Sequence, residues 1–140
     1  TVFAHEVGHY LYKHLWKGII ISSGLSLAGL FLVYLIYSAI ISHFNYPPQQ
    51  LEALPYLGLL FYLYGFITGP IGNAISRHFE YQADNFAVKE TAKPEVYKGC
   101  LEKLANLNLA DREPHPVVEF LFYSHPSIEH RIENISGDTE

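Results

Sequence analysis

The sequence predicts an all-α, membrane-embedded domain, because it contains two long uncharged segments and shows helical spacing in much of the remainder. No Asp, Glu, Lys or Arg lies between Lys17 and Glu52, or between Glu52 and Arg77. Only 16% of the 140 residues are charged, whereas soluble domains have about 25%. Depletion on this scale is typical of a protein that crosses a lipid bilayer.

The first uncharged segment, residues 18–42, is predicted to span the membrane. As a helix it would be about 37 Å long, enough to cross a hydrocarbon core of about 30 Å with some tilt. Small residues among its Ile, Leu and Phe residues suit close helix packing. A buried helix of a soluble protein is the alternative, but such helices rarely run so long without a charge.

The second uncharged segment, residues 54–76, would be about 35 Å long as a helix. It is separated from the first by a turn region at residues 43–53, where Pro47 and Pro48 prevent a continuous helix. Its second half is rich in helix-breaking residues, which predict a kink or a break in the span: Gly65, Gly69, Pro70 and Gly72.

The rest of the chain is mixed in character and is predicted to be helical in three places. Pro114 and Pro116 mark a loop between the last two of these helices. The predicted helices cover residues 1–17, 95–109 and 125–135. The chain lacks Met, so we expect it to be a fragment of a longer protein, with residues 1–140 forming one core.

Charge predicts the orientation in the membrane. All nine Lys and Arg residues lie outside the turn at residues 43–53. By the positive-inside rule, the segment before the first span and residues 77–140 face the cytoplasm. The net charge of −5 argues against a nucleic-acid partner, which requires a basic surface. The lone Cys100 excludes an internal disulfide.

The segment His5-Glu6-Val7-Gly8-His9 carries a zinc-site pattern. On a helix, His5 and His9 lie on one face and can direct imidazole nitrogens to one tetrahedral ion. Glu6 lies one step round the helix, where it can hold a water molecule beside the ion. The H-E-x-x-H arrangement is known from zinc peptidases, although alone it also fits two surface histidines with an incidental Glu.

A catalytic zinc site takes three protein ligands, and the sequence narrows the choice of the third. The metzincin pattern requires Gly at position 12 and His at position 15, where this chain has Tyr12 and Leu15. The inverted H-x-x-E-H pattern is absent. A Glu on a later helix remains, and Glu80 fits that role because two membrane crossings return it to the side of His5 and His9.

Glu80 belongs to a polar stripe at helical spacing that also includes Asn73, Arg77 and Asp84. A solvated helix face is the alternative interpretation of this stripe. Asp84 lies one turn after Glu80, where it can accept a hydrogen bond from a ligating imidazole.

The combination resembles the zinc metallopeptidase family that contains the CAAX prenyl endopeptidases and the HtpX-type membrane heat-shock proteases. The similarity covers nearly the whole chain. The sequence of residues 80–84 and the spacing are closer to the prenyl endopeptidase branch. The matching features are His-Glu-Val-Gly-His at 5–9, the two apolar segments, residues 76–84, and His125-Pro126-Ser127 with Arg131-Ile132.

The resemblance implies a helical membrane protease with one zinc ion, held by His5, His9 and Glu80, and with Glu6 as the catalytic base. It also implies roles near the substrate for His125, the candidate oxyanion donor, and Arg131. Alternatively, His125 merely precedes a helix and Arg131 pairs with a neighbouring Glu.

The implied substrate is a membrane-tethered peptide or protein, and the implied location is the lipid bilayer with the site on the cytoplasmic side. A quality-control protease of the heat-shock type and a non-enzymatic membrane scaffold are the alternatives. The other histidines have no predicted role: His14, His43, His78, His115 and His130.

Overall fold

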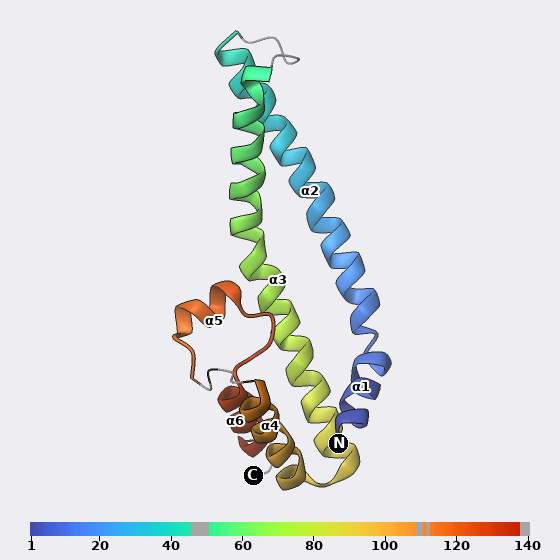
Figure 1. The fold of residues 1–140 in the computed structure, drawn as a ribbon. Helices are drawn as coiled ribbons and strands as arrows, with labels where there is room; N and C mark the ends of the chain where they lie inside the picture. Colours follow the sequence, from blue (N-terminus) through green and yellow to red (C-terminus); the bar gives the residue numbers. More distant parts are fainter. Residues whose placement is uncertain (46–50, 109–110, 112, 138–140) are drawn as a thin grey trace.

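The all-α fold class is confirmed. The computed structural model describes residues 1–45, 51–108, 111 and 113–137, and these form six α-helices and one 3₁₀-helix, with no strand (Figure 1). The elements are α1 (Val2–Leu11), α2 (His14–His43), η1 (Leu51–Ala53), α3 (Leu54–Thr91), α4 (Pro94–Asn108), α5 (Pro116–Phe122) and α6 (Ile128–Gly137).

The helices α2 and α3 form a long hairpin (Figure 1). The helices α1, α4 and α6 gather around the end of α3 that is farther from the hairpin turn, and α5 lies beside the middle of α3. In the hairpin, Gly29 faces the ring of Tyr64 with no room for a Cβ. The Tyr64 hydroxyl donates to the carbonyl oxygen of Leu25 at 2.5 Å. Absence of a side chain at Gly29 therefore lets α3 approach α2.

Both hairpin helices are long and apolar enough to cross a membrane. Only 11% of the most apolar stretch of α2 is buried within the chain, and none of the corresponding stretch of the second candidate, Leu51–Thr91. A core helix of a soluble protein would be mostly buried. The two candidates contain the predicted spans at residues 18–42 and 54–76.

Of the predicted kink or break in the second span, the kink occurs and the break does not. The helix α3 runs for 38 residues with Pro70 inside it, and Figure 1 shows a change of direction between its green and yellow-green parts. A proline removes one backbone hydrogen bond and bends a helix without ending it. As a result, one continuous helix carries both the apolar span and the polar stripe with Glu80.

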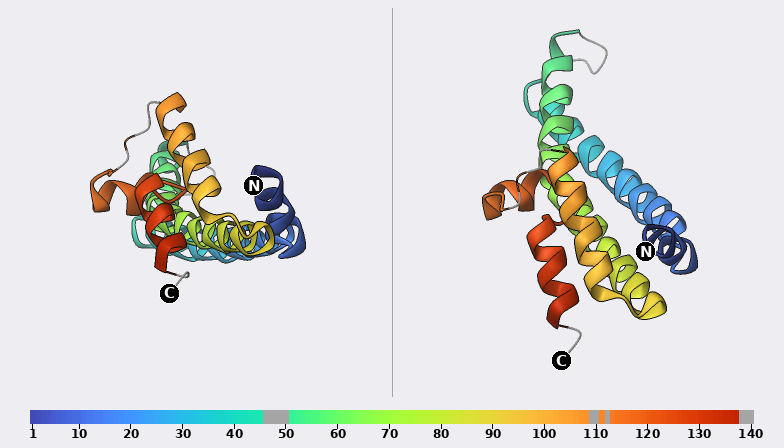
Figure 2. Two further views of the ribbon diagram at one scale, coloured as in Figure 1. Left: turned by 90° about the horizontal axis from the view of Figure 1, so that it is seen from below. Right: turned by 60° about the horizontal axis from the view of Figure 1, so that its bottom comes forward.

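The prediction of one helix over residues 1–17 was wrong. The helix α1 ends at Leu11, and Lys13 adopts a left-handed conformation with φ of 55° before α2 begins at His14. This change of direction lays α1 against α3 (Figure 2). A Cβ on Gly8 would lie 3.2 Å from the Ala83 Cα, so the glycine of the motif is where the two helices meet.

The C-terminal part differs from the sequence prediction at two points. Pro116 begins the helix α5, where only a loop was predicted, because proline suits the first turn of a helix. The last helix begins at Ile128 and not at the predicted residue 125, so His125 lies in the preceding loop. Leu109, the end of the helix predicted at 95–109, lies outside the described residues.

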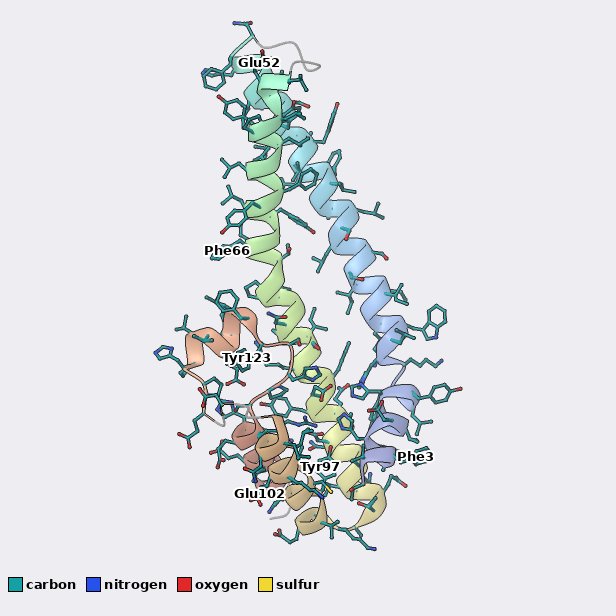
Figure 3. The ribbon with its side chains drawn as sticks, in the orientation of Figure 1. Phe3, Glu52, Phe66, Tyr97, Glu102 and Tyr123 are labelled. Atoms are coloured by element: carbon teal, nitrogen blue, oxygen red, sulfur yellow. The ribbon has the colours of Figure 1, made fainter. Side chains whose placement is uncertain are left out.

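A small hydrophobic core joins α3, α4 and α6 and fixes the end of the molecule that carries the motif. Figure 3 places Tyr97 and Phe3 at this end and Glu52 at the opposite end. The buried members of the core are Ala87, Tyr97, Leu101 and Ile135.

Candidate metal centre

Three side chains predicted to bind a metal converge between α1 and α3. The Nε2 atoms of His5 and His9 lie 3.1 Å apart. One oxygen of Glu80 lies 3.5 Å from His5 Nε2, and the other lies 3.4 Å from His9 Nε2. Among the described residues, this is the group of His, Cys, Asp and Glu side chains that could hold a metal ion.

The donor set fits zinc. Ligand atoms held about 2.0–2.1 Å from a tetrahedral ion lie about 3.3–3.4 Å from one another. The two Nε2 atoms lie 3.1 Å apart, and each lies 3.4–3.5 Å from one of the two Glu80 oxygens, which is close to that value. Two imidazoles and one carboxylate are also the ligands of many catalytic zinc sites, which leave a fourth position open.

Asp84 lies behind His5, one turn after Glu80 on α3. Its side chain is fully buried, and it accepts a hydrogen bond from His5 Nδ1 at 2.9 Å. Donation from Nδ1 fixes the tautomer in which Nε2 keeps its lone pair for a metal. Burial would raise the pKa of Asp84, but hydrogen bonds from His5 and Arg131 hold it below its usual value.

Tyr97 is a part of this site that sequence reasoning missed. Its hydroxyl donates to Asp84 at 2.6 Å and lies 3.0 Å from His5 Nδ1. Burial, together with the charge of Asp84, raises the pKa of Tyr97 well above its usual value, so the phenol stays protonated. No motif marks this tyrosine, because it reaches the site only through the packing of α4.

Arg131 connects α6 to the same carboxylate. Its Nε and Nη2 donate to the two oxygens of Asp84 at 2.7 and 2.6 Å, and Nη2 lies 3.5 Å from Glu80. Burial would lower the pKa of Arg131, but the hydrogen bond and charge of Asp84 raise it. The alternative that Arg131 pairs with a neighbouring Glu on its own helix is therefore wrong.

His9 also contacts His14, for which the sequence predicted no role. Its Nδ1 lies 2.9 Å from Nδ1 of His14, and His14 Nε2 lies 2.9 Å from the amide oxygen of Gln82. The His14 ring is buried and stacks on Phe79, with ring centroids 4.3 Å apart. Residues five apart point in different directions on a continuous helix, but the left-handed Lys13 changes the direction of the chain between His9 and His14.

A cavity of about 620 Å³ opens beside the three donors. Glu6 on α1 and His125 on the loop before α6 both line it. The His125 side chain is 66% exposed, and its Nδ1 lies 3.3 Å from Glu80. The structure thus brings Glu6, His125 and the three donors around one cavity.

The polar stripe of α3 is an interface and not a solvated face. Arg77 donates to the carbonyl oxygens of Glu119 and Tyr123 at 3.0 and 2.6 Å, and Asn73 donates to that of Leu121 at 2.8 Å. The bonds to Leu121 and Tyr123 satisfy carbonyls where α5 ends, and the bond to Glu119 adds a second donor to a carbonyl that also accepts from the Tyr123 N–H. Figure 3 shows Tyr123 where α5 ends, at the start of the segment that leads to His125.

Glu119 holds the other end of the loop between α5 and α6, which contains His125. This buried carboxylate accepts from the backbone N–H of Ser127 at 3.0 Å and lies 3.1 Å from His130 Nδ1. The loop between α5 and α6 is therefore anchored on both sides of His125.

The remaining histidines contact other groups. His78 lies 3.0 Å from the Gln82 amide nitrogen, His115 accepts from Val117 N–H at the start of α5, and His43 packs edge-on to Phe44 at the far end of α2.

Comparison with known proteins decides the family. The family model described as peptidase family M48 matches residues 1–139. The chain belongs to peptidase family M48. The family match agrees with the zinc-peptidase pattern His-Glu-Val-Gly-His, and the resemblance stated from the sequence is confirmed.

The chain is similar to several curated proteins over most of its length. It is 33% identical to the metalloprotease YhfN of Bacillus subtilis, over 95% of this chain and 32% of that protein. It is 30% identical to the CAAX prenyl protease 1 homolog of Mus musculus, over 98% of this chain and 30% of that protein. The chain therefore spans about a third of the length of these relatives.

The fold is similar to that of a solved protein. The crystal structure of S. mikatae Ste24p matches with a TM-score of 0.73 at 22% identity, over 96% of this chain and 35% of that chain. This likeness shows the all-helical fold.

Proposed function

We propose that the chain is the catalytic core of a zinc-dependent metalloendopeptidase of the membrane. The observation that carries the proposal is the convergence of His5 Nε2, His9 Nε2 and Glu80 beside a cavity that Glu6 also lines. Membership of family M48 supports the same activity. A scaffold with structural histidines would not need three donors at the spacing of a metal site.

His5, His9 and Glu80 would hold the ion. A zinc ion there would polarise the scissile carbonyl and lower the pKa of water toward about 7. Glu6, at the edge of the cavity, accepts the proton of the attacking water and then donates it to the leaving amine.

His125 and Arg131 take different parts in this proposal. His125 is exposed to the cavity, so it can donate a hydrogen bond to the oxygen that becomes negative as the peptide carbonyl is attacked. Arg131 is buried and directs two donors to Asp84. We therefore assign it to the support of Asp84 and Glu80 in preference to substrate binding.

For the substrate, we propose a membrane-tethered peptide or protein of the prenylated CAAX type. The names of the similar proteins from Mus musculus and Homo sapiens support this assignment, as does the position of the site directly after the apolar part of α3. The Lys and Arg distribution supports an active site on the cytoplasmic side.

Glu6→Gln in the full-length protein tests the reaction. The amide keeps the size of the side chain but cannot accept the proton, and Glu6 is not one of the three donors. We expect one zinc ion per chain, as in the wild type, and no peptide cleavage. Cleavage at the wild-type rate would exclude Glu6 as the base, and a wild type without zinc or cleavage would overturn the function.

A comparison of three substrates tests the substrate class. The purified full-length protein is given a farnesylated C-terminal peptide, the same peptide without the farnesyl group, and an unfolded membrane protein. We expect preferential cleavage of the farnesylated peptide. Preferential cleavage of the unfolded membrane protein would instead indicate a quality-control protease.

A further inference from the structure

His14 and Gln82 form a second hydrogen-bonded support for the metal centre, distinct from the Asp84 side. In the structure, His5 and His9 each present Nε2 to Glu80. Asp84 accounts for the orientation of His5, but it does not contact His9. The partner of His9 Nδ1 is His14, at 2.9 Å.

The direction of the hydrogen bonds follows from Gln82. Its amide oxygen faces His14 Nε2 at 2.9 Å, and an amide oxygen can only accept, so His14 Nε2 is the donor. A neutral imidazole that donates from Nε2 accepts at Nδ1. His14 Nδ1 therefore accepts from Nδ1–H of His9, which leaves the lone pair of His9 Nε2 directed at the metal site.

Packing holds this arrangement in place. The His14 ring is 4% exposed and stacks on Phe79 with an interplanar angle of 7°. The amide nitrogen of Gln82 points the other way and donates to His78 Nε2 at 3.0 Å, on the exposed side of this contact. Phe79 and Gln82 lie on α3 on either side of Glu80. The helix that supplies Glu80 therefore also positions His14, which contacts His9.

We propose that His14 and Gln82 are positioning residues that fix the tautomer and ring orientation of His9 for metal binding. The proposal rests on the zinc-peptidase function proposed above and extends it to residues outside the H-E-x-x-H pattern. In this arrangement each histidine of the motif has its own support: Asp84 with Tyr97 for His5, and His14 with Gln82 for His9.

The test is a set of four variants of the full-length protein: His14→Phe, Gln82→Leu, Gln82→Glu and His78→Ala. His14→Phe keeps a ring that can stack on Phe79 but removes both nitrogens. Gln82→Glu keeps an oxygen that accepts from His14, whereas Gln82→Leu removes it. His78→Ala removes only the group beyond Gln82.

Zinc affinity is measured by competition with a chelator, alongside the visible absorption spectrum of the cobalt(II)-substituted protein and thermal unfolding. We expect His14→Phe and Gln82→Leu to bind zinc about 10- to 100-fold more weakly, the usual loss when a supporting hydrogen bond to a metal ligand is removed. Their cobalt spectra should change. Gln82→Glu and His78→Ala should retain wild-type affinity and spectrum.

The outcomes separate this inference from the proposed function. A wild type that binds zinc and cleaves peptide, with unchanged zinc affinity in both His14→Phe and Gln82→Leu, overturns the inference alone. Weak zinc binding in Gln82→Glu equal to that in Gln82→Leu also overturns it, because loss of packing would then be the cause. A wild type without zinc and without cleavage overturns the proposed function and this inference together.

Discussion

The carboxylate of Asp84 lies 2.9 Å from Nδ1 of His5, on the side of the imidazole away from Glu80. The helix α3 thus contacts both nitrogens of one histidine, with Glu80 near Nε2 and Asp84 at Nδ1, one turn apart. Arg131 and Tyr97 hold Asp84 in that position from α6 and α4. The position of His5 therefore depends on four helices, α1, α3, α4 and α6, and not on the motif helix alone.

Replacement of Asp84 by Ala should damage both stability and metal binding. It leaves the buried Arg131 guanidinium without its partner, and breaking a buried pair in this way costs about 3–5 kcal/mol. It also removes the acceptor for His5 Nδ1, so zinc affinity should fall by about 10- to 100-fold. Unfolding in detergent and chelator competition measure the two effects.

The surface pair of Glu95 and Lys98 supplies the control. These residues lie 2.9 Å apart on α4, and the Glu95 side chain is 81% exposed. An exposed pair contributes only about 0–1 kcal/mol, so Glu95→Ala should leave stability and zinc affinity nearly unchanged. Equal losses in the two variants would contradict a special role for Asp84.

Gly8→Ala should disturb the site through the backbone. The added Cβ would lie 3.1 Å from the Phe86 ring and 3.2 Å from the Ala83 Cα. The ring can move but the helix backbone cannot, so α1 must shift away from α3. We expect a loss of about 1–3 kcal/mol in stability and a decrease in kcat/KM on the order of 10- to 100-fold.

Gly99→Ala in α4 is the matched control for this change. A Cβ there meets no atom within 4 Å, and kcat/KM should equal that of the wild type. Wild-type activity in Gly8→Ala would show that the close contact of α1 with α3 does not position the histidines.

Arg77→Met tests whether the loop that carries His125 can be disturbed without loss of the metal. Loss of the two hydrogen bonds to the carbonyls of Glu119 and Tyr123 should release that loop, and losing an oxyanion donor lowers the rate by up to about 100- to 1000-fold. Arg77 contacts none of the three donors directly, so zinc content should stay at one ion per chain. Peptide cleavage and metal analysis of the same preparation measure both quantities.

Lys89→Met, an exposed position on the same helix, should keep both cleavage and zinc. If Arg77→Met lost its zinc along with its activity, the division between the loop and the metal donors would be wrong.

Much of the fold was predictable because the evidence is local in the sequence. The absence of charge between Lys17 and Glu52 predicted the first span, since a membrane helix must carry few charges. Glu80 and Asp84 could be placed on one helix face from their spacing alone. The number of crossings then predicted that they lie on the same side of the membrane as His5.

The missed features depend on tertiary packing or on single backbone angles. On a continuous helix, His9 and His14 would point about 140° apart, and only the left-handed turn at Lys13 brings their rings together. Tyr97 reaches His5 from 92 positions away in the sequence. The helix that Pro116 begins is fixed by Arg77 and Asn73, which lie far from it in the sequence.

The zinc content of the Glu80→Ala variant of the full-length protein is the most direct test of the central claim that Glu80 completes the metal site with His5 and His9. Metal analysis of the purified wild type should give one zinc ion per chain. The Glu80→Ala variant, folded by circular dichroism, should give almost none after dialysis against a weak chelator. One retained zinc ion per chain in that variant would contradict the assignment.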